Sequence, residues 1–140
     1  MMILTTVFEM TVYTTPIPLA RPRVVGKRTY TPKRSQQAKS LLALHARSKY
    51  RKEIHTGPMG ISIKFIHKRP KRLGIGSRVP KSTIPDGDNL LKLVLDALEG
   101  IIYKNDGQFC KYNVEDWYGD SEDSPQIIIT ISTVSVTHTK

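Results

Sequence analysis

Residues 85–108, PDGDNLLKLVLDALEGIIYKNDGQ, gather carboxylates in a chain whose formal net charge is +10. Asp86 and Asp88 stand one residue apart before an apolar segment, and Asp106 follows that segment in a polar turn. Three carboxylates that converge repel one another unless a cation lies between them. Mg²⁺ suits such a site, because it takes a few carboxylate ligands and keeps several waters. The residue types therefore predict a site for Mg²⁺, with Mn²⁺ as the alternative ion.

Lys92 stands four residues after Asp88, which is about one helical turn. A metal held by the aspartates could activate water and neutralise a phosphodiester under attack, while Lys92 stabilises the charge that develops on the phosphate. A purely structural interpretation also fits. Asp88 would then be a helix N-cap, Lys92 would form i,i+4 ion pairs, and Asp106 would make an Asx turn with Gly107. The spacing alone does not separate the two interpretations.

Other metal and nucleotide motifs fit less well. An EF-hand loop starting at Asp86 would need Gly at its sixth position and Glu at its twelfth, where this chain has Leu91 and Ala97. The four histidines are scattered, and the sequence has no glycine-rich phosphate-binding loop. Cys110 is the only cysteine, which excludes an internal disulfide and a zinc site built on thiolates.

The positive charge is concentrated in the first part of the chain. Residues 1–85 carry 18 Lys and Arg against two acidic residues, a net +16, and residues 86–140 carry four against ten, a net −6. A basic excess of this size indicates a polyanionic partner, most often nucleic acid, rather than a surface that only keeps the protein soluble. The cations also cluster in two groups, which are Arg21, Arg23, Lys27, Arg28, Lys33 and Arg34, then Lys68, Arg69, Lys71, Arg72, Arg78 and Lys81.

The length of 140 residues fits one domain (1–140), and the 39% apolar content is typical of a folded protein. No apolar run could cross a bilayer and no signal peptide is evident, so we expect a cytoplasmic protein with no membrane contact. Residue patterns predict strands at 3–14, 59–68, 109–119 and 126–136, and a hairpin at 23–31. They predict helices over 33–52 and 88–100. This order suggests an α+β fold of α/β type, with two helices on a mixed sheet.

Each predicted helix has an apolar stripe. The first should begin at Thr31-Pro32 and bury Leu41, Leu42, Leu44 and Ala46. The second should bury Leu91, Val94, Leu95 and Leu98, and place Lys92, Asp96 and Glu99 on another face with Asp88. Residues 69–85 should form a mobile surface loop. If residues 101–103 run back along the second helix, Asp106 would come to lie beside the start of that helix.

The segment DGDNLLKLVLDAL…NDGQ resembles the signature of the RusA family of Holliday junction resolvases. The family pattern is Asp-x-Asp-Asn-x-x-Lys, then Asp-Ala-Leu, then an acidic pair that leads into Gln. The upstream segment PLARPRVVGKRTYTPKRS resembles the N-terminal part of the family more loosely. This chain departs from the pattern at the acidic pair, where it has Asn105 before Asp106.

The resemblance implies a role for each matching residue. Asp86 and Asp88 correspond to the paired metal-binding aspartates, Asp106 to the third acidic ligand, Lys92 to the essential lysine, and Asn89 to the Asn after the second Asp. It also implies a homodimer that uses Mg²⁺ to nick two opposed strands of a four-way junction, and no small-molecule substrate.

The hypothesis is therefore a RusA-like DNA endonuclease whose basic N-terminal segment and 68–81 loop bind the DNA backbone. Two alternatives remain at this point. The protein could be a nuclease for flaps or replication intermediates, or a non-catalytic protein that binds branched DNA.

Overall fold

The computed structural model describes residues 1–17, 23–26, 28–30, 33–82 and 87–137. Several predictions fall outside this part of the chain, namely the helix start at Thr31-Pro32 and the residues Arg21, Lys27 and Asp86. The side chains of Arg23 and Arg28 lie outside it as well. The outcomes that follow concern the described residues.

The chain folds into strands, two helices and two short 3₁₀ turns. In order these are β1 (Met2–Val12), β2 (Arg23–Val25), β3 (Arg28–Tyr30), α1 (Lys33–Lys49), β4 (Met59–His67), η1 (Lys71–Leu73), β5 (Val79–Pro80), α2 (Gly87–Leu98), η2 (Asp106–Gln108), β6 (Phe109–Tyr118) and β7 (Gln126–Val136). The predicted strands agree with these bounds to within two residues at each end, and β7 agrees at both ends.

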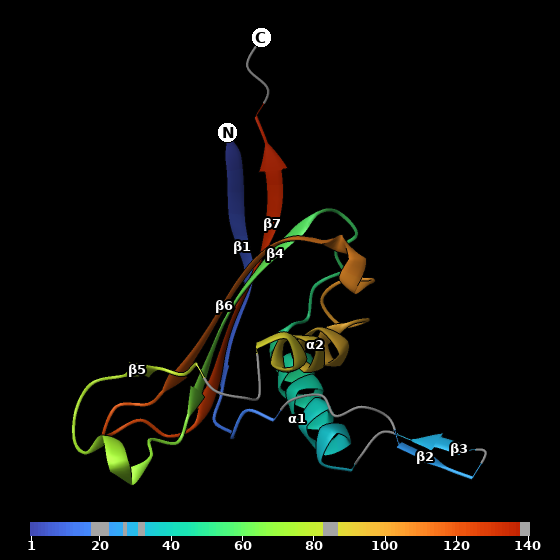
Figure 1. Cartoon of the computed structure of the whole chain (residues 1–140). Helices are drawn as coiled ribbons and strands as arrows, with labels where there is room; N and C mark the ends of the chain where they lie inside the picture. The colour runs from blue at the N-terminus through green and yellow to red at the C-terminus, as the bar shows by residue number, and fades with distance from the viewer. Residues whose placement is uncertain (18–22, 27, 31–32, 83–86, 138–140) are drawn as a thin grey trace.

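The main sheet has five strands in the order β1-β7-β4-β6-β5. β4 and β6 are parallel, whereas the other neighbouring strands are antiparallel. α2 lies in the crossover from β4 to β6, and Figure 1 shows both helices on the same face of the sheet. β2 and β3 form a separate antiparallel hairpin, as predicted. The predicted α+β fold, with two helices on a mixed sheet, is therefore confirmed.

The hydrophobic core lies between the sheet and the two helices. Alternate residues of the central strands point into it, because successive side chains of a strand lie on opposite faces. Ile63 of β4 lies opposite Ile129 of β7, and both are 0% exposed. α1 contacts α2, and α2 in turn contacts β6. This packing holds α2 against the sheet and leaves its other face open to solvent.

α2 buries a wider face than the single predicted stripe. Leu90 and Leu93 are buried, whereas Leu91 is only partly buried. The reason is that α2 is covered on two sides, by α1 and by the sheet. The predicted N-cap role of Asp88 is also wrong, because the helix already begins at Gly87 and Asp88 lies within its first turn.

α1 ends at Lys49, before the predicted end at residue 52. Leu42 and Ala46 are buried as predicted, but Leu44 is 66% exposed. Leu44 is two residues from each of them, which places it on the opposite side of a helix with 3.6 residues per turn. Among the described helices, none is both long enough and apolar enough to span a bilayer.

Candidate metal site and nucleic-acid surface

The polar side chains of α2 lie on the face that the core does not cover. Asp88, Asn89, Lys92 and Asp96 are exposed. Within the described part of the chain, Lys92 forms no ion pair with Asp88 or with Asp96. The i,i+4 pairing of the structural interpretation is therefore absent here. A carboxylate and an ammonium of the first two turns both remain available to a ligand.

A capping box holds η2, the turn that carries Asp106. Asn105 Oδ1 accepts a hydrogen bond from the backbone N–H of Gly107 at 2.6 Å, and Gln108 Oε1 accepts one from the backbone N–H of Asn105 at 2.8 Å. Gln108 Nε2 also donates to two backbone carbonyls of the connection between α1 and β4, at 3.0 and 2.9 Å. The Asn and Gln of the NDGQ segment therefore shape the turn, while the Asp106 side chain is exposed.

Glu99 and Tyr103 determine where this turn lies. Glu99 Oε1 accepts a hydrogen bond from the backbone N–H of Asp106 at 3.0 Å. The buried Tyr103 hydroxyl donates to the carbonyl oxygen of Leu95 at 2.6 Å, which ties the turn to the last part of α2. Burial raises the pKa of Tyr103, and the negative charges of Glu99, Asp106 and Asp96 raise it further. Asp106 thus lies near the C-terminal end of α2.

Asp106 is therefore not beside the start of α2, where Asp88 lies. The helix has 12 residues, which corresponds to a length of about 18 Å. Figure 1 shows η2 on the side where α2 ends. Among the described residues, no group of three His, Cys, Asp or Glu is arranged to hold a metal ion. Asp86 lies outside these residues, so the site formed by three aspartates stays a prediction.

The donor chemistry of the two described aspartates nevertheless fits a hard divalent cation. Both Asp88 and Asp106 are exposed carboxylates, and neither has a cationic side chain as a partner within the described residues. Carboxylate oxygens with room for water ligands are what Mg²⁺ requires. A metal-binding role for these residues is therefore chemically consistent with the structure.

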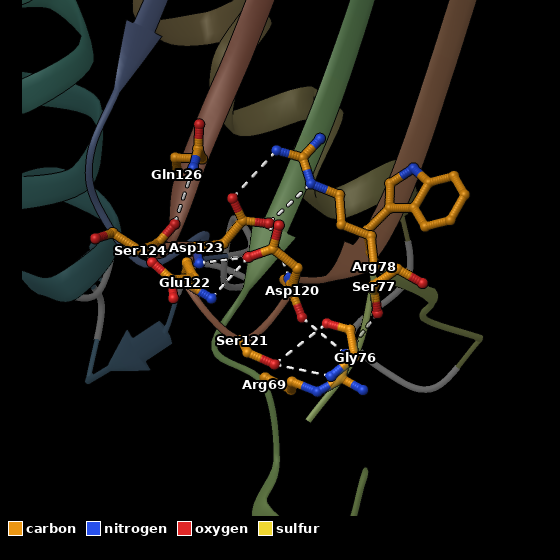
Figure 2. A network of polar contacts seen from close by, with 12 residues as sticks. Arg69, Gly76, Ser77, Arg78, Asp120, Ser121, Glu122, Asp123, Ser124 and Gln126 are labelled. Atoms are coloured by element: carbon orange, nitrogen blue, oxygen red, sulfur yellow. Dashed lines mark hydrogen bonds and ion pairs between the residues drawn. The ribbon is translucent and has the colours of Figure 1, made fainter. Parts of the chain in front are cut away.

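Residues 69–82 are more ordered than the predicted mobile loop. This segment contains η1 and β5, and Figure 2 shows the polar network that holds it. Arg69 organises this network with hydrogen bonds of 2.6 to 3.3 Å, which it donates to the carbonyl oxygens of Leu73, Gly74, Ser77 and Gly119. The sequence pattern could not reveal this, because most of the acceptors belong to the backbone of the loop itself.

The same segment is docked onto the turn between β6 and β7. Arg78 Nε donates to Asp123 Oδ2 at 2.8 Å, and its Nη2 lies 3.3 Å from the other carboxylate oxygen. The backbone N–H of Gly76 donates to Ser121 Oγ at 2.8 Å. The Arg78 hydrogen bond lowers the pKa of Asp123, so this stabilisation is present above the ordinary Asp pKa and is lost as pH falls through the lowered value.

We expect Arg69→Ala to loosen the segment from Pro70 to Lys81 because it removes the donors that connect the loop carbonyls. The free energy of unfolding should fall by about 1–2 kcal/mol, and amide hydrogen exchange of the segment should accelerate. Exchange mass spectrometry with a thermal melt measures both effects. Arg72→Ala is the matched control, because Arg72 lies over the Tyr118 ring, 5.8 Å from its centroid, rather than in the network. Equal exchange in the two variants would contradict the role of Arg69.

The predicted DNA-binding cations thus differ in how they are placed. The donors of Arg69 are used within the loop, whereas five other described cations are exposed, namely Lys33, Arg34, Lys68, Lys71 and Arg72. Lys33 and Arg34 lie in the first turn of α1, and the other three flank or form η1. Their contact with DNA stays a prediction. A phosphate backbone could reach these five exposed cations without disturbing the fold.

The sequence analysis missed a polar cluster at the carboxyl ends of the parallel strands β4 and β6. His67 Nε2 lies 2.5 Å from Asp116 Oδ1, and Lys81 Nζ lies 4.0 Å from Asp116 Oδ2. Burial lowers the pKa of His67 and raises the pKa of Asp116, and the attraction between the two opposes both shifts. The backbone N–H of Lys81 also donates to the Asp116 carbonyl at 2.8 Å, which anchors the start of the segment that leads to α2.

No local pattern could have indicated this cluster, because its three side chains come from separate parts of the chain. They meet only when β4, β5 and β6 form one sheet.

Exposed cations on α1 and around η1, together with an Asp88 and a Lys92 that form no ion pair within the described residues, are typical of proteins that act on nucleic acids. Residues 14–132 match the family Endodeoxyribonuclease RusA, and this chain belongs to that family of DNA endonucleases. The chain is also similar to the uncharacterized protein YqaN of Bacillus subtilis (strain 168). The two are 31% identical over 140 residues, which cover 91% of this chain and 96% of YqaN. The family resemblance seen in the sequence is therefore confirmed.

Proposed function

We propose that this protein is a Mg²⁺-dependent endonuclease that resolves four-way DNA junctions by paired, symmetric nicks. Membership of the RusA family supports the endonuclease activity. The observation that carries the proposal is the exposed face at the start of α2, where Asp88 and Lys92 lie one turn apart and form no ion pair within the described residues. Opposite charges at this spacing usually attract each other, so their availability favours a role in binding a ligand.

Each predicted residue has a role that its chemistry allows. Asp86 and Asp88 would hold Mg²⁺, or Mn²⁺, through carboxylate oxygens. Asp106 lies by the other end of α2, so its part as a third ligand stays a prediction, which the Asp106→Asn variant tests. When bound, the ion supplies a Lewis acid and lowers the pKa of a coordinated water. Lys92 would bind the scissile phosphate and offset its developing charge. Asn89, next to Asp88 on the exposed face, would help to position the DNA backbone.

Two opposed strands of a junction require two matched cuts, so the proposal includes a homodimer with one site in each copy. Twofold symmetry is the commonest form of such an assembly and would present two equal sites to a substrate with the same symmetry.

The direct test is cleavage of a synthetic four-way junction labelled on opposed strands, with Mg²⁺ and with a chelator. Symmetric nicks on both strands that disappear with the chelator are the expected result. Preferential cutting of a flap substrate would instead identify a nuclease for flaps or replication intermediates. Junction binding without cleavage in Mg²⁺ or in Mn²⁺ would identify a non-catalytic protein and contradict the proposal.

The exposed cations of the loop should contribute to a salt-dependent affinity for the junction. Each phosphate contact releases counterions and adds roughly −0.9 to the slope of log affinity against log salt. Replacing both Lys71 and Arg72 by Ala should therefore reduce the steepness of that slope by up to about 1.8. Fluorescence anisotropy titrations at a series of salt concentrations measure it. Arg69 is left unchanged, because its loss would also disturb the loop.

The matched control for this titration replaces Arg51 and Lys52 by Ala. Both are exposed cations outside the predicted DNA-binding clusters. Their replacement removes the same charge as the replacement of Lys71 and Arg72. If the two double variants change the slope equally, the effect comes from net charge and η1 is not in the interface.

A further inference from the structure

Ile75 stands almost entirely in solvent, in the loop between η1 and β5. Its side chain is 95% exposed, the highest value among the large apolar side chains of the described residues. Its neighbours in the chain are Gly74 and Gly76, which have no side chains that could cover it. Apolar side chains scattered singly over a surface are common. The surroundings of Ile75 therefore decide whether its exposure has a use.

The backbone on both sides of Ile75 is fixed by hydrogen bonds. Before it, Arg69 Nε donates to the Gly74 carbonyl at 2.6 Å. After it, the Gly76 N–H donates to Ser121 Oγ at 2.8 Å, and the Gly76 carbonyl accepts from the backbone N–H of Ser121 at 3.1 Å (Figure 2). A flexible loop could fold an isoleucine back onto the protein, whereas this loop holds the Ile75 side chain in solvent.

The segment around Ile75 is basic. Residues 68–81 contain six Lys and Arg and no Asp or Glu. The adjoining turn at 120–123 has three acidic residues, but one of them, Asp123, is paired with Arg78, so positive charge remains in excess. A single apolar side chain among cations suits a polyanion that also offers apolar surfaces, as DNA does where the faces of its bases are accessible. A protein partner would usually meet a contiguous apolar patch instead.

We propose that Ile75 is a wedge that inserts between bases at the branch point of a DNA junction. Apolar side chains of DNA-binding proteins separate neighbouring bases in this way, and the cost is the loss of base stacking. That cost is smaller at bases whose pairing or stacking is already weakened, as it is where strands exchange between the arms of a junction. Lys71 and Arg72, which are exposed in η1, would bind the adjacent phosphates.

The choice of a branched substrate rests on the proposed function, and the wedge adds a means by which this chain distinguishes a branch from a linear duplex. Cations that bind phosphates do not make this distinction, because every duplex offers the same backbone. A rigidly held apolar side chain does, because only a weakened step admits it at low cost. Ile75 is therefore assigned to recognition of the branch, separately from the residues proposed for cleavage.

The test is the fluorescence of 2-aminopurine at the branch point of a synthetic four-way junction, measured with a chelator so that no strand is cut. This base analogue becomes brighter when it loses its stacked neighbours. The unchanged protein should raise the emission at the branch point, but not that of the same analogue in the middle of an arm. Ile75→Ser should abolish the rise and weaken junction binding by about tenfold or more, the value of burying an isoleucine side chain. Its affinity for a linear duplex should change by less than about twofold, because the phosphate contacts remain.

Two further variants show whether the effect belongs to an apolar side chain at this position. Ile75→Met should keep most of the rise, because it remains an apolar wedge. Leu44→Ser is the matched control, because Leu44 is 66% exposed on α1 and lies outside both basic groups, so its loss should change neither emission nor affinity. An Ile75→Ser protein with the full rise and full junction affinity would overturn the wedge. Equal losses of junction and duplex affinity would overturn it as well, since they would indicate a general loss of DNA binding.

Cleavage in Mg²⁺ is scored separately from the emission. A protein that opens the branch point through Ile75 but cuts no strand would contradict the proposed nuclease activity and leave the wedge standing. A protein that nicks the junction symmetrically without any rise in emission would contradict the wedge and leave the proposed function standing.

Discussion

Asp88→Asn is expected to reduce junction cleavage by at least about a thousandfold, because a metal site contributes several kcal/mol to the stabilisation of the transition state. Asn has nearly the same shape as Asp but lacks the charge that holds a divalent cation. Junction affinity should be unchanged or slightly higher, since one negative charge near the phosphates is removed. The measurement is single-turnover cleavage at saturating protein, beside an anisotropy titration of the same junction.

The structure supplies a matched control for this variant. Asp96→Asn removes the same charge from the same exposed face of α2, but at the end away from the first turn. Asp88 lies near the N-terminus of α2, where its negative charge interacts favourably with the helix dipole and stabilises the helix by about 0.3–1 kcal/mol. We therefore expect Asp88→Asn to lose a little thermal stability. Near-normal cleavage by a folded Asp88→Asn protein, or equal losses in the two variants, would contradict the site.

Asp106→Asn belongs in the same series. The hydrogen bond from residue 106 to Glu99 uses the backbone N–H, so the substitution preserves the position of the turn. A loss of cleavage as large as that of Asp88→Asn would make Asp106 a ligand. A small loss would restrict the metal site to residues at the start of α2.

Local patterns were sufficient to predict most of the elements. β7 is rich in β-branched residues and agrees with its prediction at both ends, because such residues suit a central strand that is paired on both edges. Ile61, Ile63 and Phe65 of β4 alternate with more exposed residues, and this period identifies a strand without any tertiary information. The fold class followed from the order of these elements.

The errors occurred where a residue is positioned by distant neighbours. Leu90 and Leu93 are buried because α1 and the sheet cover two sides of α2, and a helix alone gives no sign of a second covered side. Arg69 was grouped with the DNA-binding cations, but its partners are carbonyls that come together only when the loop folds back on itself. The pairing of His67 with Asp116 required a parallel neighbour from much later in the chain.

The candidate site likewise has some features that the sequence could indicate and others that depend on tertiary contacts. The sequence could indicate which aspartates have the chemistry for a metal, and Asp88 and Lys92 share an exposed face as the helical spacing required. It could not indicate that Glu99 holds the Asp106 turn at the other end of α2, because that depends on one hydrogen bond across the turn.

Lys92→Ala is expected to reduce the rate of junction cleavage by orders of magnitude while DNA affinity changes little. Many other cations would contact the DNA backbone, but Lys92 would act where negative charge develops during the reaction. The fold should tolerate the change, because Lys92 is exposed and forms no ion pair within the described residues. Single-turnover cleavage of a saturated junction complex measures the rate, and a thermal melt measures stability.

Two further variants separate a catalytic charge from a general one. Lys104→Ala removes an exposed lysine beyond the end of α2 and should leave the cleavage rate unchanged. Lys92→Arg should restore only part of the rate, because a planar guanidinium directs its hydrogen bonds differently from a compact ammonium. Full activity in Lys92→Arg would mean that a positive charge alone is enough at this position. A folded Lys92→Ala protein that cuts at the rate of the unchanged enzyme would show that Lys92 takes no part in the chemistry, and Asp88 would then have to act without a cation one turn away.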